Sequence, residues 1–184
     1  MKKINKSEEP SSLTKFKRKN SSNKWEDIHT EQSQSIYEDC LLQCMDDQNY
    51  LCGYTEIKLD DNYHIDHFIK RDIDPRQTFD WQNMFAAVHD SKFGADFKDK
   101  TVNNNDYNKR LKKYNYILNP VTDYMKNRFI FSTNGVIEPA DRNDREATET
   151  IRVFNLQEDS LNSRRKQAME NTRKLLEQMD KASL

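Results

Sequence analysis

The stretch that decides the fold runs from residue 63 to residue 68 and reads Tyr-His-Ile-Asp-His-Phe. Polar and apolar side chains alternate along it, which is the pattern of a half-buried β-strand. Side chains two residues apart share a strand face, so His64 and Asp66 lie on one face and His67 on the other. A straight strand therefore cannot bring His64 and His67 onto one zinc ion, and the His-x-x-His spacing is not a zinc signature here.

The pair Asp66-His67 at a strand end suits phosphodiester hydrolysis. A carboxylate can bind a divalent cation that neutralises charge on the leaving oxygen, while a neutral imidazole accepts a proton from the attacking water. Asn83 precedes the apolar run 84–88 and is expected to hold the loop that presents His67. An isolated Asp-His pair is more often structural than catalytic, so the order of these elements carries the hypothesis.

The remaining metal ligands are expected on two sides of the apolar run. His64 shares the strand face of Asp66, and the segment after the run offers His89 and Asp90, with Asp96 behind them. We therefore predict Asp66, His64, Asp90 and His89 as metal ligands, and His67 and Asn83 as catalytic residues.

The whole chain predicts a mainly helical α+β fold in one domain. Its 184 residues are 34% hydrophobic and 33% charged, which limits the chain to a modest hydrophobic core. With 3 Gly and 4 Pro, a β-sandwich or β-barrel is disfavoured. Residues 1–30 are read as an extended N-terminal arm and residues 31–184 as the domain, with the site within 51–100. The expected elements are a helix over 31–50, strands at 51–54, 63–68 and 84–88, a hairpin around Asn134-Gly135, a helix from Asn143 with Glu146 as capping-box partner, and a helix over about 159–180.

The local distribution of charge is more informative about binding partners than the net charge of -1. Lys109, Arg110, Lys112 and Lys113 are interleaved with tyrosines, so this stretch is a candidate for nucleic-acid binding, with the lysines on phosphates and the tyrosines stacked on bases. A solvated helix face is the alternative from charge alone.

Cysteine count and hydropathy indicate a soluble, cytoplasmic protein. No run approaches the roughly 18 to 20 apolar residues of a membrane span, and the first residues are not a signal peptide. Cys40, Cys44 and Cys52 are an odd number at unremarkable spacing, which fits free thiols in a reducing cytosol.

Several segments together resemble one known family. The order of Cys52-Gly-Tyr-Thr-Glu56, His64-Ile-Asp-His-Phe68 and Asp80-Trp-Gln-Asn83 is similar to PtuB, the HNH-type (ββα-metal) nucleases of Septu and retron-associated antiphage defence systems. The resemblance continues through the first thirteen residues, Tyr116 to Pro120, the 129–136 hairpin and Ala147 to Leu156, and so covers nearly the whole chain.

The resemblance implies roles and partners. His67 matches the general base, Asp66 a metal ligand and Asn83 the middle residue of the HNH triad, with Mg²⁺ or Mn²⁺ as the single cation. It also implies a PtuA-like ATPase of the ABC/SMC type, a DNA or RNA substrate such as tRNA, and a reverse transcriptase with msDNA if the system is a retron. ATP use must come from another subunit, because this sequence has no phosphate-binding Gly-x-x-x-x-Gly-Lys-Ser/Thr motif.

The chain departs from the family where relatives carry cysteines. Thr55, His89 and Ala95 stand where paired cysteines are frequent, so a structural zinc is not expected. This departure leaves two hypotheses, an active endonuclease of an antiviral defence complex and a catalytically degenerate HNH scaffold that couples a partner ATPase to nucleic acid.

Overall fold

A two-stranded antiparallel sheet lies at the centre of the computed structural model, which describes residues 1–19, 24–30, 33–102 and 107–182. Strand β1 (Tyr63–His67) pairs with β2 (Met84–Val88), so that His64 lies opposite Ala87 and His67 opposite Met84. All five residues of β2 are buried, which explains why its sequence is continuously apolar rather than alternating. The predicted strands at 63–68 and 84–88 are confirmed.

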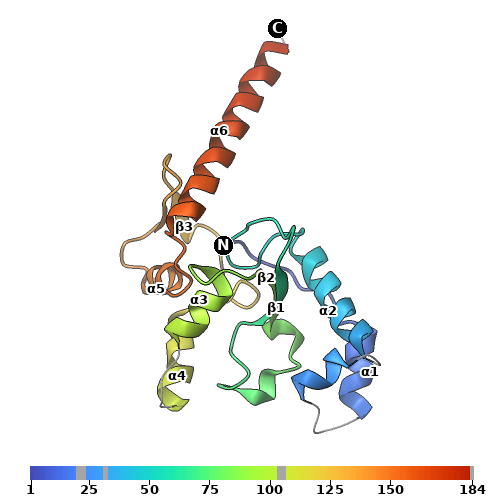
Figure 1. Cartoon of the computed structure of the whole chain (residues 1–184). Coiled ribbons are helices and arrows are strands. Elements are labelled where there is room, and N and C mark those ends of the chain that lie inside the picture. The colour runs from blue at the N-terminus through green and yellow to red at the C-terminus, as the bar shows by residue number, and fades with distance from the viewer. Residues whose placement is uncertain (20–23, 31–32, 103–106, 183–184) are drawn as a thin grey trace.

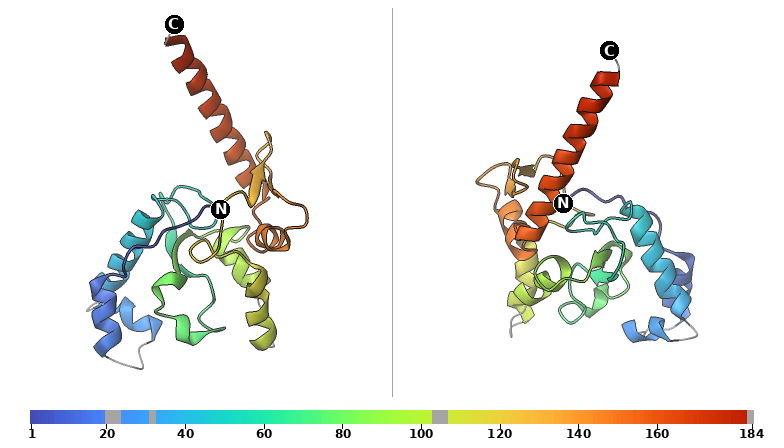
Figure 2. Two further views of the ribbon diagram at one scale, coloured as in Figure 1. Left: turned by 180° about the vertical axis from the view of Figure 1, so that it is seen from behind. Right: turned by 45° about the horizontal axis from the view of Figure 1, so that its top comes forward.

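Helices cover the sheet from two sides (Figure 1). Helix α2 (Gln34–Asp47) packs on β1 and β2, and α3 (Gly94–Thr101) packs on β2. Helix α4 (Tyr107–Lys113) follows α3 on the same side, as both views in Figure 2 also show. The arrangement is mixed helix and strand in one small domain, as the sequence predicted.

Helix α2 confirms the helix expected over 31–50. Its inner face buries Cys40, Cys44 and Met45, and the Cys44 thiol lies 3.7 Å from the carbonyl of Met84. Cys40, Cys44 and Cys52 are all free, as predicted, and all three are buried. Burial raises the pKa of Cys40 to about 12, so this thiol is protonated and unreactive.

The N-terminal segment differs from the extended arm expected for residues 1–30. It contains α1 (Ser11–Lys19) and the 3-10 helix η1 (Trp25–His29). Leu13 and Ile28 are fully buried and Trp25 is nearly so. Single apolar residues among lysines and serines give little periodicity in the sequence, yet each of these three side chains packs into the core.

The segment 51–54 also differs from expectation, because it forms no strand. One isolated bridge joins Leu51 to Lys58, and the chain turns between them. Tyr54 is nevertheless fully buried, stacked on Phe154 with ring centroids 4.5 Å apart. The apolar residues here serve core packing rather than strand pairing, which the alternation pattern alone cannot separate.

The C-terminal third contains the predicted hairpin and two helices. Strand β3 (Phe129–Phe131) pairs with β4 (Ile137–Pro139), followed by α5 (Arg145–Val153) and α6 (Asp159–Ala182). The cap of α5 is Asp144 rather than Asn143, since its carboxylate accepts a hydrogen bond from the Ala147 amide at 2.9 Å. The remaining 3-10 helices are η2 (Pro75–Gln77), η3 (Trp81–Asn83) and η4 (Tyr114–Tyr116).

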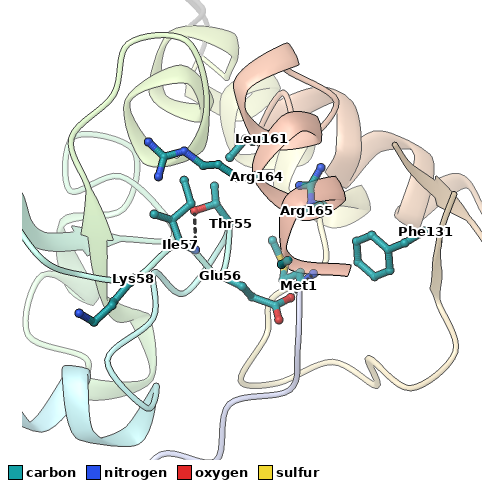
Figure 3. A pocket seen from close by; sticks show the side chains of 10 residues that line it. Met1, Thr55, Glu56, Ile57, Lys58, Phe131, Leu161, Arg164 and Arg165 are labelled. Atoms are coloured by element: carbon teal, nitrogen blue, oxygen red, sulfur yellow. Dashed lines mark hydrogen bonds and ion pairs between the residues drawn. The ribbon is translucent and has the colours of Figure 1, made fainter. Parts of the chain in front are cut away.

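Helix α6 projects away from the rest of the molecule (Figures 1 and 2). Leu161 in its first turn is buried, whereas Leu175, Leu176 and Met179 are more than half exposed. A hollow of about 270 Å³ lies where its start meets the body (Figure 3). The carboxylate of Glu56, which lines this hollow, is paired with the α-amino group of Met1 at 2.8 Å. Within the described residues, no helix is long and apolar enough to cross a lipid bilayer.

A methyl group added in the hairpin turn is predicted to destabilise the fold strongly. Gly135 has a φ of +87°, and a Cβ there would lie 1.9 Å from the backbone carbonyl oxygen of Asn162 on α6. Gly135→Ala should therefore lower the free energy of unfolding by about 2 kcal/mol or more in a urea titration. Asn134→Ala, an exposed change in the same turn, should cost about 1 kcal/mol or less. Equal unfolding midpoints for the two variants would contradict the close approach of hairpin and helix.

Candidate active site

A pocket of about 480 Å³ opens at the end of β1. Its wall is completed by the turn that follows β1 and by helix α3. Its lining is formed by His64, Ile65, Asp66, His67, Lys70, Arg71, Asp72 and Asp99. Three acids, two histidines and two basic side chains beside a buried strand end make this pocket the candidate for chemistry on a charged substrate.

His67 is 6% exposed and held in one orientation. Its Nε2 lies 2.9 Å from the carbonyl oxygen of Thr78, and the ring of Trp25 packs against it edge-to-face with centroids 4.5 Å apart. Because a carbonyl oxygen only accepts hydrogen bonds, Nε2 carries the proton of the neutral ring and Nδ1 carries the lone pair. Burial lowers the pKa of His67 to about 4, so the ring is neutral near pH 7. The geometry thus leaves one basic nitrogen on His67.

Asp66 is fixed by two donors on the same oxygen. Its Oδ2 accepts hydrogen bonds from the Tyr54 hydroxyl at 2.5 Å and from the Lys98 ammonium at 2.8 Å. Lys98 is fully buried on α3 and also donates to the carbonyls of His67 at 2.6 Å and Phe68 at 3.1 Å. Burial alone opposes the charge, but Asp66 and Asp99 raise the pKa of Lys98, which stays an ammonium. Lys98 therefore joins α3 to the end of β1.

Asp99 supplies a second carboxylate to the pocket. Its Oδ1 lies 3.2 Å from the Lys98 ammonium. That oxygen is buried and accepts no hydrogen bond from the residues that the structure describes. Burial raises the pKa of Asp99 to about 6; Lys98 opposes the shift and the Asp66 carboxylate adds to it. Asp99 and Asp66 thus place two buried carboxylates around one ammonium, and a pair of carboxylates of this kind can also hold a divalent cation.

Asn83 fastens the loop between β1 and β2. Its Oδ1 accepts from the Ile69 amide at 2.8 Å, and its Nδ2 donates to the carbonyls of Ile69 at 3.0 Å and Gln77 at 3.2 Å. The carbonyl of Asn83 also accepts from the Phe68 amide at 2.9 Å. These four bonds tie down the residues that follow His67, which is the task expected of Asn83 from the sequence.

The other predicted metal ligands divide between two places. His64 lines the pocket with Asp66, whereas His89 and Asp90 border a different hollow. Asp90 accepts from the Lys92 amide at 2.8 Å, a local turn contact. His64 stacks on His89 with ring centroids 3.6 Å apart, and one donor atom from each of His64, His89 and Asp96 lies within 4.8 Å of the others.

Sequence reasoning missed Lys98, Asp99 and Tyr54. A faint signal existed for Lys98, because Ala95, Lys98 and Val102 fall on one helical face and all three are buried. A lysine inside an apolar stripe indicates a buried partner for its charge. Asp99 and Tyr54 have no comparable signal, since they come to the site only through the fold.

The predicted nucleic-acid-binding residues lie on α4. Lys109 and Lys112 are exposed, and the Lys113 ammonium donates to the carbonyl of Thr101 at 3.0 Å. The side chain of Arg110 lies outside the described part of the structure. The exposed lysines are compatible with either interpretation of the basic stretch.

Comparison with known proteins gives one informative similarity. No protein-family model matches this chain. The chain is 30% identical over 107 residues to an Escherichia coli protein named "Retron Ec83 putative HNH endonuclease". The match spans 53% of this chain and 42% of that protein, so the chain covers less than half the length of this relative. The similarity is therefore to a protein named as an HNH endonuclease, and it does not point to PtuB or Septu in particular.

The buried state of His67 predicts how stability changes with pH. Its pKa falls from 6.5 to about 4 on folding, so between these values the unfolded chain binds a proton that the folded protein excludes. The contribution of neutral His67 to the free energy of unfolding is fully present above pH 6.5 and is lost as the pH falls. The loss reaches about 2 to 3 kcal/mol at about pH 4.5.

The measurement is urea unfolding at about pH 7.5 and about pH 4.5. Wild type should lose about 2 to 3 kcal/mol more than His67→Gln, whose side chain does not titrate. An equal loss in both proteins would show that His67 is not held neutral by burial.

Proposed function

We propose that this chain is a metal-dependent HNH endonuclease that hydrolyses phosphodiester bonds with His67 as the general base. The observation that carries the proposal is the hydrogen bond from Nε2 of His67 to the Thr78 carbonyl. It leaves Nδ1 as the basic nitrogen of a neutral ring, in a pocket that Asp66, Lys70 and Arg71 also line. A base of this kind can take the proton of an attacking water.

The surrounding residues position this base and the substrate. Asn83 fastens the loop after His67, and the Trp25 ring restricts rotation of the imidazole. Lys70 and Arg71 bring positive charge to the pocket wall, where a phosphate of the substrate would bind. Their ammonium and guanidinium groups also contact acids, Asp99 at 3.7 Å and Glu26 at 3.2 Å, respectively. The pocket therefore combines acid and base chemistry with phosphate recognition.

The pocket also fits one divalent cation. Asp66 and Asp99 would hold it, with His64 beside them, and oxygen-rich ligands favour Mg²⁺ or Mn²⁺. Such a cation, when bound, neutralises charge on the phosphate and the leaving oxygen. Asp99 takes the place that the sequence analysis gave to Asp90 and His89, because it lines the same pocket as Asp66.

The wider role follows from the resemblance to PtuB and from the name of the retron relative. The chain would act in an antiviral defence complex with a PtuA-like ABC/SMC-type ATPase, and with a reverse transcriptase and msDNA if it is encoded in a retron. DNA and RNA, including tRNA, present the same phosphodiester, so both remain candidate substrates. The exposed Lys109 and Lys112 are candidates for contact with the polymer backbone. The compartment proposed is the cytoplasm.

One observation favours the alternative of a catalytically degenerate scaffold. The Lys98 ammonium already occupies Oδ2 of Asp66 at 2.8 Å, so one positive charge is present where a metal ligand is expected. In that case the protein would couple its partner ATPase to nucleic acid without cutting it. The two functions differ in what they require of His67, because a scaffold does not need a general base.

Removing the base separates the two functions. His67→Ala, co-expressed with the neighbouring genes, should lose phage protection and lower plasmid or RNA cleavage by about 100-fold or more, while the complex still assembles. His29→Ala removes an exposed histidine on η1 and should leave cleavage unchanged. Full protection by the His67 variant would rule out the catalytic function and favour the scaffold.

Metal removal tests the carboxylate pair. Chelation with EDTA should abolish cleavage by the purified complex, and Mg²⁺ or Mn²⁺ should restore it. Asp99→Asn should raise the Mg²⁺ concentration for half-maximal cleavage by about tenfold or more. Asp72→Asn, in the same pocket but with a side chain 57% exposed, is the matched control and should change it little. Cleavage that persists after chelation would contradict the proposed cation.

A further inference from the structure

A second group of metal-binding side chains lies beside the candidate active site. His64 comes from β1, His89 follows β2 and Asp96 lies in the first turn of α3. His64 is opposite Ala87, and His89 is two residues further on, so both rings are on the same face of the sheet. The hydrogen bond from the His89 amide to the Asn62 carbonyl, at 2.9 Å, holds this extension of β2 in place. The fold thus brings three donors together from three separate elements.

The contacts within this group are short. The two imidazole rings are stacked at 3.6 Å with an angle of 11° between their planes, and Nδ1 of His89 lies 3.4 Å from Oδ2 of Asp96. One donor atom of each residue lies within 4.8 Å of the other two. Nδ1 of His64 is buried and has no hydrogen-bond partner among the described residues. A buried ring nitrogen without a partner requires an explanation, and a bound cation nearby provides one.

The donor atoms lie further apart than those around a bound zinc ion, and one of the two stacked rings must turn before both can point a nitrogen at one ion. Nitrogen and oxygen ligands of zinc lie about 2.0 to 2.2 Å from the metal, which places tetrahedral donors about 3.3 Å apart. The present spacing of up to 4.8 Å must therefore close by about 1.5 Å. The His89 and Asp96 side chains are 46% and 33% exposed, so they can make this movement without disturbing the core.

We propose that His64, His89 and Asp96 form a site for a zinc-like transition-metal ion, distinct from the carboxylate pair at Asp66 and Asp99 and contrary to the expectation, from the missing cysteines, of no structural zinc. Two imidazoles and one carboxylate favour Zn²⁺, whereas Mg²⁺ prefers oxygen ligands alone. Three protein ligands leave the fourth position open to water. His64 lines the pocket at the end of β1, whereas His89 and Asp96 do not.

The consequence of this site is a cross-link between the sheet and the start of α3. Asp96 lies less than one turn before Lys98 and Asp99, the two residues through which α3 reaches the pocket. An ion bound here would hold α3 against β1 and β2 and so fix the position of both. The cross-link requires neither a functional base at His67 nor any nuclease activity.

Thermal unfolding of the full-length protein, without a polyhistidine tag, tests the site with Zn²⁺ alone as the probe. At about 100 times its dissociation constant, Zn²⁺ should raise the Tm of wild type by about 5 to 10 °C, with one ion per chain in equilibrium dialysis. His89→Ala and Asp96→Ala should each lose this metal-induced shift. Co²⁺ in place of Zn²⁺ should give a visible absorption spectrum in wild type and not in these variants.

Two controls separate this site from the proposed nuclease pocket. His67→Ala and His29→Ala should both retain the Zn²⁺ shift, because neither residue belongs to the group. Absence of a shift in wild type, or a shift that survives in His89→Ala and disappears in Asp99→Asn, would overturn the proposal. Each comparison uses the difference between metal-free and metal-bound Tm of the same variant, so a change in basal stability does not affect it.

Discussion

The buried ammonium of Lys98 is the interaction on which the site depends. It bonds simultaneously to the Asp66 carboxylate, to the His67 carbonyl and to the Phe68 carbonyl. An unpaired charge at this depth would cost several kcal/mol, so the ammonium and the strand end require each other. Helix α3 is thereby held at the point where β1 ends, and the same ammonium fixes the Asp66 carboxylate and the backbone of His67. Tyr54 completes the arrangement from a segment that precedes both.

Sequence patterns predicted the central sheet and the C-terminal hairpin because local rules are sufficient there. The alternation around His64 and Asp66 and the apolar run before His89 each specify a strand without help from distant residues. The same local rules place Asp66, His67 and Asn83 around the end of one strand. They failed for Leu13 and Ile28, because single apolar residues in a charged segment become buried only when the rest of the core exists.

Two of the site residues that sequence reasoning did not find share one property. Lys98 and Asp99 lie on a polar helix whose exposed and buried faces are set by its packing on β2. Lysine and aspartate are ordinarily solvated, so from the sequence alone both residues are expected at the surface. Only the tertiary contacts of α3 show that they are buried. Asp90 is a different case, since its position after β2 favoured a ligand and its carboxylate accepts a hydrogen bond from the Lys92 amide, so its role as a ligand stays a prediction. A candidate ligand set is therefore best chosen after the helix face is known.

Helix α6 depends for its own order on contacts at its beginning. Residues 171–180 are all exposed, and a stretch of this length, about 15 Å, is too short to be stably helical by itself in water. Forming the first turn is the costly step of helix formation, and here the packed turn at Leu161, against the tight bend at Gly135, provides it. The remaining turns only propagate an existing helix. The outward presentation of Leu175, Leu176 and Met179 is therefore set by a nucleus that lies at the opposite end of the same helix.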